Sequence, residues 1–319
     1  MQCFNRIHKS SISSRLKLLV SAKSKLIPHQ FFKTNAENQR TKLHIFKSFN
    51  NNFPKHFSTT ISKMNPKPRV TCIQFSATAD KTHNQDTVTK LIKNAISQHP
   101  DTKIIVLPEC YNSPYGVEHF EQYAEQIGNV GDDENSCKSE SIKKLLQQAK
   151  ELNVTIVGGS IPETHNNKLY NTCIVCSKEG KIIAKHRKVH LFDIDVPDGI
   201  RFFESEVLTA GDDPTMFEID NLKIGIGICY DIRFPEYAAL LRSKDANLLI
   251  YPGAFNTTTG PMHWELLQRA RAVDNQCFVV TCSPSRAEGG YPAWGHSTIV
   301  SPWGKVVLFL IWQLNLVET

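Results

Sequence analysis

From Arg69 onward, short apolar runs alternate with segments whose apolar residues recur every three or four positions. Runs of four to six apolar or β-branched residues predict buried strands, and helical spacing predicts amphipathic helices. The strands are expected at Val70–Phe75, Ile104–Leu107, Val154–Val157, Asn247–Tyr251 and Phe278–Cys282, and the helices at 88–96, 142–149, 236–241 and 263–275.

Two further pairs of strands are separated by short turns and predict β-hairpins. The first hairpin joins Leu169–Cys176 to Lys181–Ala184, and the second joins Thr298–Ser301 to Val306–Leu310. Strands connected both by helices and by hairpins indicate a mixed sheet with helices packed outside it. The sequence therefore predicts an α/β fold, and no linker divides the chain after Pro68.

The stretch from Lys223 to Asp231 begins as a strand that ends in a thiol. Its three isoleucines fall on one face at a period of two, and its two glycines fall on the other face, where another layer can approach closely. The pattern breaks at Cys229, at the carboxyl end of the strand, where open α/β folds carry their chemistry. Cys229 is therefore either a nucleophile or a packed apolar thiol.

Two other ionisable residues follow apolar strands in the same way. Glu109 follows Ile-Ile-Val-Leu-Pro, and Lys188 ends the basic segment after the first hairpin. Taken singly, Glu109 would be interpreted as a carboxylate that faces water at the end of a strand. Lys188 would be interpreted as one member of a solvated run of charged residues. Together with Cys229 they could form a catalytic site for nucleophilic attack. A thiol needs a base, which a buried carboxylate such as Glu109 can supply, and an ammonium such as Lys188 can stabilise the oxyanion that forms. No histidine is required, and His190 and His296 are interpreted as structural.

The charge of the chain is unevenly distributed. The 319 residues carry a formal net charge of +6, but residues 1–68 hold 13 Lys and Arg against one acidic residue. The remainder of the chain therefore holds 24 Lys and Arg against 30 acidic residues. The body is acidic, so the overall basicity does not indicate a nucleic acid partner. No apolar run reaches about 18 residues, so no membrane partner is expected.

The basic leader, residues 1–64, has the composition of a mitochondrial transit peptide, since it is rich in Arg, Lys and Ser and almost free of acid. We expect it to be disordered and to direct the protein to the mitochondrial matrix. A shorter cytoplasmic form could start at Met64. The alternative is a basic tail without a targeting role.

Nine cysteines are scattered without the spacing of a disulfide framework. The one CxxC segment, Cys173-Ile-Val-Cys176, lies in a predicted strand, where alternation puts the two thiols on opposite faces and disfavours a metal site. Gly225-Ile-Gly227 lacks the third glycine of a dinucleotide loop, and no Walker-type loop is present. The composition favours free thiols in a reducing compartment.

Three motifs in order resemble the Glu–Lys–Cys signature of the nitrilase superfamily, also called the carbon–nitrogen hydrolases. They are Leu-Pro-Glu109, His-Arg-Lys188-Val-His-Leu-Phe and Gly-Ile-Cys229-Tyr-Asp-Ile-Arg-Phe-Pro-Glu. The resemblance covers residues 69–305. Within the superfamily the chain is most similar to the ω-amidase branch, through segments such as Asn112-Ser-Pro-Tyr-Gly116, Leu169-Tyr-Asn-Thr172, Tyr251-Pro-Gly-Ala-Phe-Asn256 and Thr259-Gly-Pro-Met-His-Trp264.

The resemblance implies an α-β-β-α sandwich of mixed sheets with outer helices, which dimerises into a longer layered body. It implies a hydrolase acting on the carbon–nitrogen bonds of linear amides, without metal or organic cofactor. Cys229 would attack the amide, Glu109 would be the base, and Lys188 with the backbone N–H of Tyr230 would hold the oxyanion. A thioester on the cysteine would be the intermediate.

A second glutamate of the family's active site corresponds to Glu204, which would orient Lys188 or the water. The alternative is a surface carboxylate beside Glu206. The implied substrates are ω-amides of short 2-oxo dicarboxylates, 2-oxoglutaramate and 2-oxosuccinamate. Tyr115, Arg233 and Thr258 are the candidates for binding the distal carboxylate, although Arg233 could instead pair with Glu236.

Residues 306–319 are atypical, because their last dozen residues do not resemble the family and members usually continue further. We therefore expect a truncated C-terminus, a weakened homodimer and a less stable protein. The alternatives to ω-amidase activity are an amidase for deaminated glutathione and a catalytically impaired remnant. A true nitrilase is disfavoured by Asn112-Ser-Pro-Tyr-Gly116.

Overall fold

The computed structural model describes residues 68–197, 201–286 and 290–309. The chain divides into two units between Pro66 and Lys67, and all the described residues belong to the second. The predictions for residues 1–64 and for 310–319 therefore lie outside the described residues.

The apolar runs of the N-terminal half form a six-stranded mixed sheet in the order β1-β2-β3-β5-β4, with β6 paired to β5. Its strands are β1 (Arg69–Cys72), β2 (Thr102–Val106), β3 (Thr155–Val157), β4 (Ile161–His165), β5 (Lys168–Cys176) and β6 (Ile182–Arg187). The first three are parallel to one another, and β5 runs antiparallel to β3, β4 and β6. The predicted hairpin of β5 and β6 is confirmed.

The C-terminal half forms a second six-stranded sheet in the order β14-β13-β12-β11-β10-β9. Its strands are β9 (Thr215–Ile219), β10 (Leu222–Ile226), β11 (Leu248–Pro252), β12 (Phe278–Cys282), β13 (Thr298–Val300) and β14 (Val306–Phe309). The parallel strands β10, β11 and β12 form its centre. A separate short hairpin contains β7 (Asp193–Asp195) and β8 (Arg201–Phe203).

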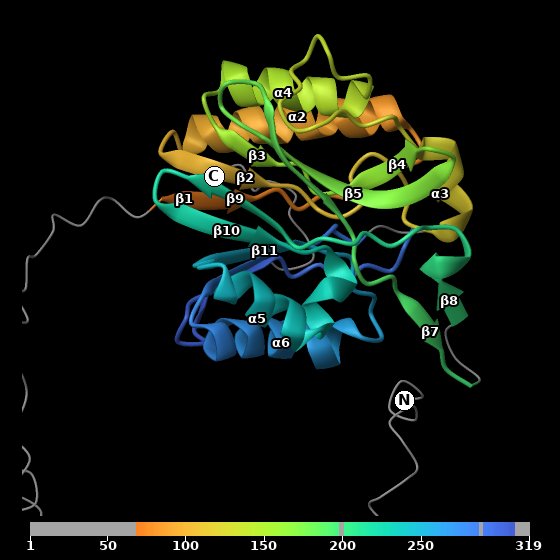
Figure 1. Ribbon diagram of the computed structural model, residues 1–319, viewed down its shortest axis with the longest axis vertical. Coiled ribbons are helices and arrows are strands. Elements are labelled where there is room, and N and C mark those ends of the chain that lie inside the picture. Colours follow the sequence, from red (N-terminus) through yellow and green to blue (C-terminus); the bar gives the residue numbers. More distant parts are fainter. Residues whose placement is uncertain (1–67, 198–200, 287–289, 310–319) are drawn as a thin grey trace, which may run out of the picture. The chain divides into compact units, whose positions relative to one another are not determined.

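The two sheets pack face to face between two pairs of helices, as Figure 1 shows. The helices are α2 (Lys81–Gln98), α3 (Val117–Tyr123), α4 (Glu140–Glu151), α5 (Pro235–Ser243) and α6 (Gly260–Asn275), with 3-10 turns η4 (Glu204–Glu206) and η5 (Cys229–Arg233). Helices α2 and α4 cover the outer face of the first sheet, and α5 and α6 cover that of the second. The α-β-β-α sandwich expected from the resemblance is confirmed.

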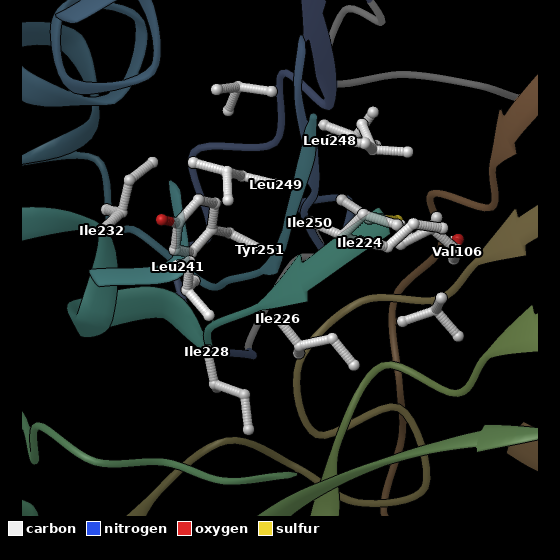
Figure 2. Close-up of a cluster of buried hydrophobic side chains, with 14 of the residues drawn as sticks. Val106, Ile224, Ile226, Ile228, Ile232, Leu241, Leu248, Leu249, Ile250 and Tyr251 are labelled. Carbon is white, nitrogen blue, oxygen red and sulfur yellow. Dashed lines mark hydrogen bonds between the residues drawn. The ribbon is translucent and has the colours of Figure 1, made fainter. Parts of the chain in front are cut away.

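Strand β10 has the two-faced character that the sequence predicted. Its isoleucines share the core between the sheets with Val106 of β2, while Leu241 of α5 packs against the opposite face (Figure 2). A Cβ added at Gly225 would lie 2.9 Å from Leu241 Cδ1, so glycine allows the helix to approach this closely. The glycine face of β10 therefore lets α5 pack closely against the strand that leads to Cys229.

The sequence pattern missed the elements with weak apolar periodicity. Helix α3 and strands β4, β7, β8 and β9 were not predicted, whereas the predicted helices and strands are all present, with bounds that differ by up to seven residues. Cys173 packs between the sheets and Cys176 under the outer helices, so the two lie on opposite faces of β5 as expected. The eight described cysteines are free thiols. No described helix is long and apolar enough to cross a bilayer.

Candidate active site

The three ionisable residues at strand ends meet between the two sheets. Glu109 follows β2, Lys188 follows β6 directly, and Cys229 follows β10. Lys188 Nζ lies 2.9 Å from Glu109 Oε1 and 2.9 Å from Glu204 Oε1. All four side chains are buried, with Lys188 and Glu204 fully inaccessible. The interpretation of Lys188 as part of a solvated charge run is therefore wrong, and so is that of Glu204 as a surface carboxylate.

Glu109 is held in one orientation by three donors. Its Oε1 accepts from Lys188 Nζ and from Asn171 Nδ2, each at 2.9 Å. Its Oε2 accepts from the backbone N–H of Ala254, also at 2.9 Å. Asn171 lies on β5 of the first sheet, and Ala254 lies in the loop that follows β11 of the second sheet. The carboxylate of Glu109 therefore connects the two sheets. A carboxylate held in this way is oriented for proton transfer.

Burial and charge determine the ionisation of the Lys188 cluster. Burial by itself would lower the pKa of Lys188, but the carboxylates of Glu109 and Glu204 raise it well above its usual value, so the ammonium remains charged. Burial raises the pKa of Glu204, whose Oε2 accepts from the backbone N–H of Phe192 at 2.8 Å. The Lys188 side chain therefore stays a charged ammonium, held in place between the two carboxyl groups.

Cys229 is the first residue of the turn η5 and has a left-handed backbone, with φ of 46°. A non-glycine residue in this region costs on the order of 1–3 kcal/mol and is held there only by surrounding contacts. Burial raises the pKa of the thiol, the Glu109 carboxylate raises it further, and Lys188 opposes them. The resting sulfur is thus a protonated thiol that needs a base before it can attack.

Gly159 allows the Glu109 segment to pack against the next strand. It has φ of +59°, and a Cβ there would clash with the backbone oxygen of Pro108. Gly159→Ala is expected to lower the free energy of unfolding by about 2–5 kcal/mol and to displace Glu109, since backbone strain and overpacking add. Chemical denaturation measures the loss.

The matched control is Gly131→Ala, because Gly131 has φ of +99° and no atom within 4 Å of the added Cβ. In that variant the free energy of unfolding should fall by about 1–2 kcal/mol, which is the cost of backbone strain alone. Equal losses in the two variants would contradict the close contact at Pro108.

A small cavity of about 10 Å³ opens onto Cys229. It is lined by Phe192, Cys229, Tyr230, Arg233, Ala254, Phe255, Asn256, Thr259 and Tyr291. A volume of this size holds about one water molecule, so lining side chains must move apart when an organic substrate binds.

Arg233 is the cation of this cavity. Its Nη1 lies 3.2 Å from Nδ1 of His263, and its guanidinium carbon lies 4.7 Å from the centre of the Phe255 ring. Its buried Nε has no hydrogen-bond partner among the described residues. The guanidinium thus contacts His263 rather than forming the ion pair with Glu236 that was the sequence alternative. Arg233 is positioned to bind an anionic group beside Cys229.

The other two candidates for substrate binding lie in different places. The Tyr115 hydroxyl donates to Glu204 Oε1 at 2.9 Å, and its ring stacks on Phe202, so this residue belongs to the Lys188 cluster. Thr258 is exposed and does not line the cavity, which its neighbour Thr259 does. The structure therefore brings Tyr115 to the site and leaves Thr258 outside it.

Several residues of the site were not identified from the sequence. Asn171 and Ala254 hold Glu109, and His263 contacts Arg233. Tyr291 lines the cavity and donates to the backbone oxygen of Ala254 at 2.8 Å. Asn171 and Ala254 lie in sequence segments on which the resemblance to the ω-amidase branch was based. That resemblance was the only feature of the sequence that could have pointed to them. Among the described residues, no cluster of three or more His, Cys, Asp or Glu could hold a metal ion.

Comparison with known proteins agrees with this geometry. The family model for carbon–nitrogen hydrolases matches residues 69–315. The ω-amidase NIT2 of Xenopus tropicalis is 53% identical over 242 residues, which are 76% of this chain and 83% of that protein. The human ω-amidase NIT2 is 49% identical over 240 residues, 75% of this chain and 83% of its own length.

Two further similarities extend this comparison. The chloroplastic ω-amidase of Arabidopsis thaliana is 54% identical over 235 residues, 73% of this chain and 62% of that protein. The crystal structure of Saccharomyces cerevisiae Nit3, a member of branch 10 of the nitrilase superfamily, superimposes with a TM-score of 0.69 at 43% identity and covers 76% of this chain and 85% of that one.

Proposed function

Because this chain belongs to the carbon–nitrogen hydrolase family, we propose that it is an ω-amidase, which hydrolyses the terminal amide of 2-oxoglutaramate or 2-oxosuccinamate to the 2-oxo dicarboxylate and ammonia. The observation that carries the proposal is the buried cluster of Glu109, Lys188 and Cys229 in a chain about half identical to ω-amidases. These relatives favour an ω-amidase over an amidase for deaminated glutathione.

In the first half of the proposed reaction, Cys229 is acylated. Glu109 takes the thiol proton as the sulfur attacks the amide carbon, and the carbonyl oxygen becomes an oxyanion. The oxyanion accepts hydrogen bonds from Lys188 Nζ and from the backbone N–H of Tyr230. When it collapses, the carbon–nitrogen bond breaks, Glu109 returns the proton to the nitrogen, and ammonia leaves a thioester on Cys229.

In the second half, water hydrolyses the thioester. Glu109, now ionised again, takes a proton from the water as its oxygen attacks the thioester carbon, and the same donors hold the second oxyanion. Collapse breaks the carbon–sulfur bond, and the proton on Glu109 returns to the sulfur. Glu204 contributes by accepting from Lys188 Nζ at 2.9 Å, which keeps the ammonium oriented.

Arg233 binds the distal carboxylate of the substrate in this proposal, because it is the cation that lines the cavity at Cys229. Arg233→Met is expected to raise KM and to lower kcat/KM about 10- to 150-fold, the loss that corresponds to about 1.5–3 kcal/mol for a charged hydrogen bond. Steady-state kinetics measure it. Arg242→Met, on the outer helix α5 and bonded to the backbone of Ala246, is the control and should leave KM unchanged.

Substrate affinity should depend on the ionisation of His263. Burial, with a smaller contribution from Arg233, lowers the pKa of His263, so the folded protein favours the neutral ring, whose Nδ1 can accept from Arg233. This arrangement is complete at and above the ordinary histidine pKa, and it is lost as the pH falls through the lowered pKa of His263 in the folded protein. We expect KM to rise as the pH falls through this range. A pH-independent KM in the wild type would contradict the role of His263.

The proposed function is tested by measuring ammonia release from 2-oxoglutaramate, deaminated glutathione and a simple nitrile. We expect the highest kcat/KM for 2-oxoglutaramate. Preference for deaminated glutathione would instead establish the alternative amidase, and no turnover of any of the three would favour an impaired remnant.

We further propose that residues 1–64 direct the protein to mitochondria, on the basis of their basic, acid-poor composition. The chloroplastic relative carries a name that also implies targeting to an organelle. Imaging a fluorescent fusion to Met1–Met64 tests this, and a diffuse cytosolic signal would contradict it.

Homodimerisation through helices α5 and α6 is also proposed. Four large apolar side chains are exposed on these helices: Leu240, Met262, Leu266 and Val273. Exposed apolar side chains grouped on one layer favour association with a second copy. Light scattering of the purified protein tests this, and a monomer at micromolar concentration would contradict it.

A further inference from the structure

Strand β6 directs its charged residues to two different networks, one on each face. Lys185 and Arg187 point to one side and bind the fully buried carboxylate of Glu163, with Arg187 donating two bonds of 2.8 Å. Because side chains alternate along a strand, His186 and Lys188 point to the other side, toward the active site. The strand that leads to Lys188 is therefore fixed independently on each face.

Lys188 is flanked in sequence by two histidines that share one acceptor. His186 Nε2 lies 3.2 Å from Asp231 Oδ2, and His190 Nδ1 lies 2.8 Å from Asp231 Oδ1. The backbone N–H of His190 also donates to Asp231 Oδ1, at 2.9 Å. The chain is therefore attached to one carboxylate two residues before Lys188 and two residues after it.

The same carboxylate closes the turn that carries the nucleophile. Asp231 Oδ2 accepts from the backbone N–H of Ile228 at 2.8 Å, and Asp231 N–H donates to the backbone oxygen of Ile228 at 3.0 Å. Cys229 lies inside this closed turn, in its left-handed conformation. A carboxylate that spans the turn is the kind of contact needed to hold such a residue in place.

We propose that Asp231 is a positioning residue that fixes the Lys188 ammonium relative to the Cys229 sulfur, by holding the segment around each of them with one buried carboxylate. The inference rests on the proposed function, because it assigns Asp231 a role in the geometry of that reaction. Asp231 itself does not line the cavity at Cys229, so its effect on the reaction passes through the two residues that it positions.

The chemistry of Asp231 suits this role. Its side chain is fully inaccessible, and burial by itself would raise its pKa, but the hydrogen bonds from His186 and His190 hold the pKa below its usual range. The carboxylate is thus ionised and has acceptors for all four donors. An amide in its place would offer one oxygen and one NH₂ group, so at least one of the two attached segments would lose its bond.

The test is Asp231→Asn, assayed with 2-oxoglutaramate. Misplacement of Lys188 relative to Cys229 should lower kcat about 10- to 100-fold while KM changes less than about threefold, because the substrate carboxylate binds elsewhere. Retention of wild-type kcat would overturn the proposal. If wild-type protein itself has no ω-amidase activity, the proposed function fails first, and the two failures are thereby distinguished.

Glu163→Gln is the matched control, since Glu163 is an equally buried carboxylate bound to the opposite face of the same strand. It should lower Tm while leaving kcat within about twofold, because it leaves the Asp231 network intact. An equal fall in kcat in both variants would show that Asp231 acts only through stability, which also overturns the proposal.

His190→Gln provides a second variant if Asp231→Asn does not fold. Its side chain is 26% exposed, so its loss is less damaging to the core. Because it removes the imidazole bond to Asp231 and leaves only the backbone N–H bond of His190 on that side of Lys188, kcat should fall about 10-fold at unchanged KM. Unchanged kcat in this folded variant would overturn the proposal.

Discussion

Replacing Cys229 with alanine is expected to abolish ammonia release, with kcat falling on the order of 10⁶-fold, as when the nucleophile of a covalent hydrolase is removed. Cys229 is the one cysteine among the described residues that line the cavity, and its thiol carries the acyl intermediate in the proposed reaction. Activity with 2-oxoglutaramate and the melting transition are measured on the same sample.

The matched control is Cys277→Ala, because Cys277 is also a buried free thiol but bonds to the backbone oxygens of Ala246 and Asn275, away from the cavity. Its kcat should stay close to that of the wild type. Wild-type turnover in Cys229→Ala, or loss of turnover in both variants, would contradict the role of Cys229.

Replacing Lys188 with methionine should damage both stability and activity. It leaves the carboxylates of Glu109 and Glu204 buried without their shared cation, which costs about 3–5 kcal/mol when one partner of a buried pair is removed. It also removes an oxyanion donor, so kcat should fall about 10²- to 10³-fold in the protein that remains folded. Denaturant titration and kinetics at low temperature separate the two effects.

Lys185→Met is the control for this variant. Lys185 belongs to the same basic segment but binds Glu163, which keeps two hydrogen bonds from Arg187 after the change. A smaller stability loss and an unchanged kcat are expected. If Lys185→Met and Lys188→Met reduced kcat equally, the assignment of Lys188 to the oxyanion would be wrong.

The strands that carry Glu109, Lys188 and Cys229 could be predicted from the sequence because each is a short apolar run with a clear end. Their hydrophobic period fixes which side chains are buried, and the order of the three motifs suggested that they meet. The pattern could not show that they meet, because β2, β6 and β10 belong to two different sheets whose packing depends on residues far apart in sequence.

The substrate side was predicted less well, for physical reasons. Thr259 lines the cavity and Thr258 does not. This difference depends on the local backbone conformation, which the pattern of hydrophobic and polar residues does not specify. The contact of Arg233 with His263 joins two segments 30 residues apart, whereas the sequence alternative considered only the local neighbour Glu236. Ala254 acts through its backbone N–H, so its side-chain type carries no signal for that role.

The central claim, a thioester on Cys229, is tested most directly by hydrolysing glutaramate with wild-type protein in rising concentrations of hydroxylamine, because this analogue lacks the 2-oxo group that would itself form an oxime. Ammonia and glutarate are measured together. A thioester predicts that hydroxamate replaces glutarate as hydroxylamine intercepts the acyl group, while hydroxamate and glutarate together still equal the ammonia released. Formation of glutarate and ammonia in equal amounts at every hydroxylamine concentration would contradict the claim.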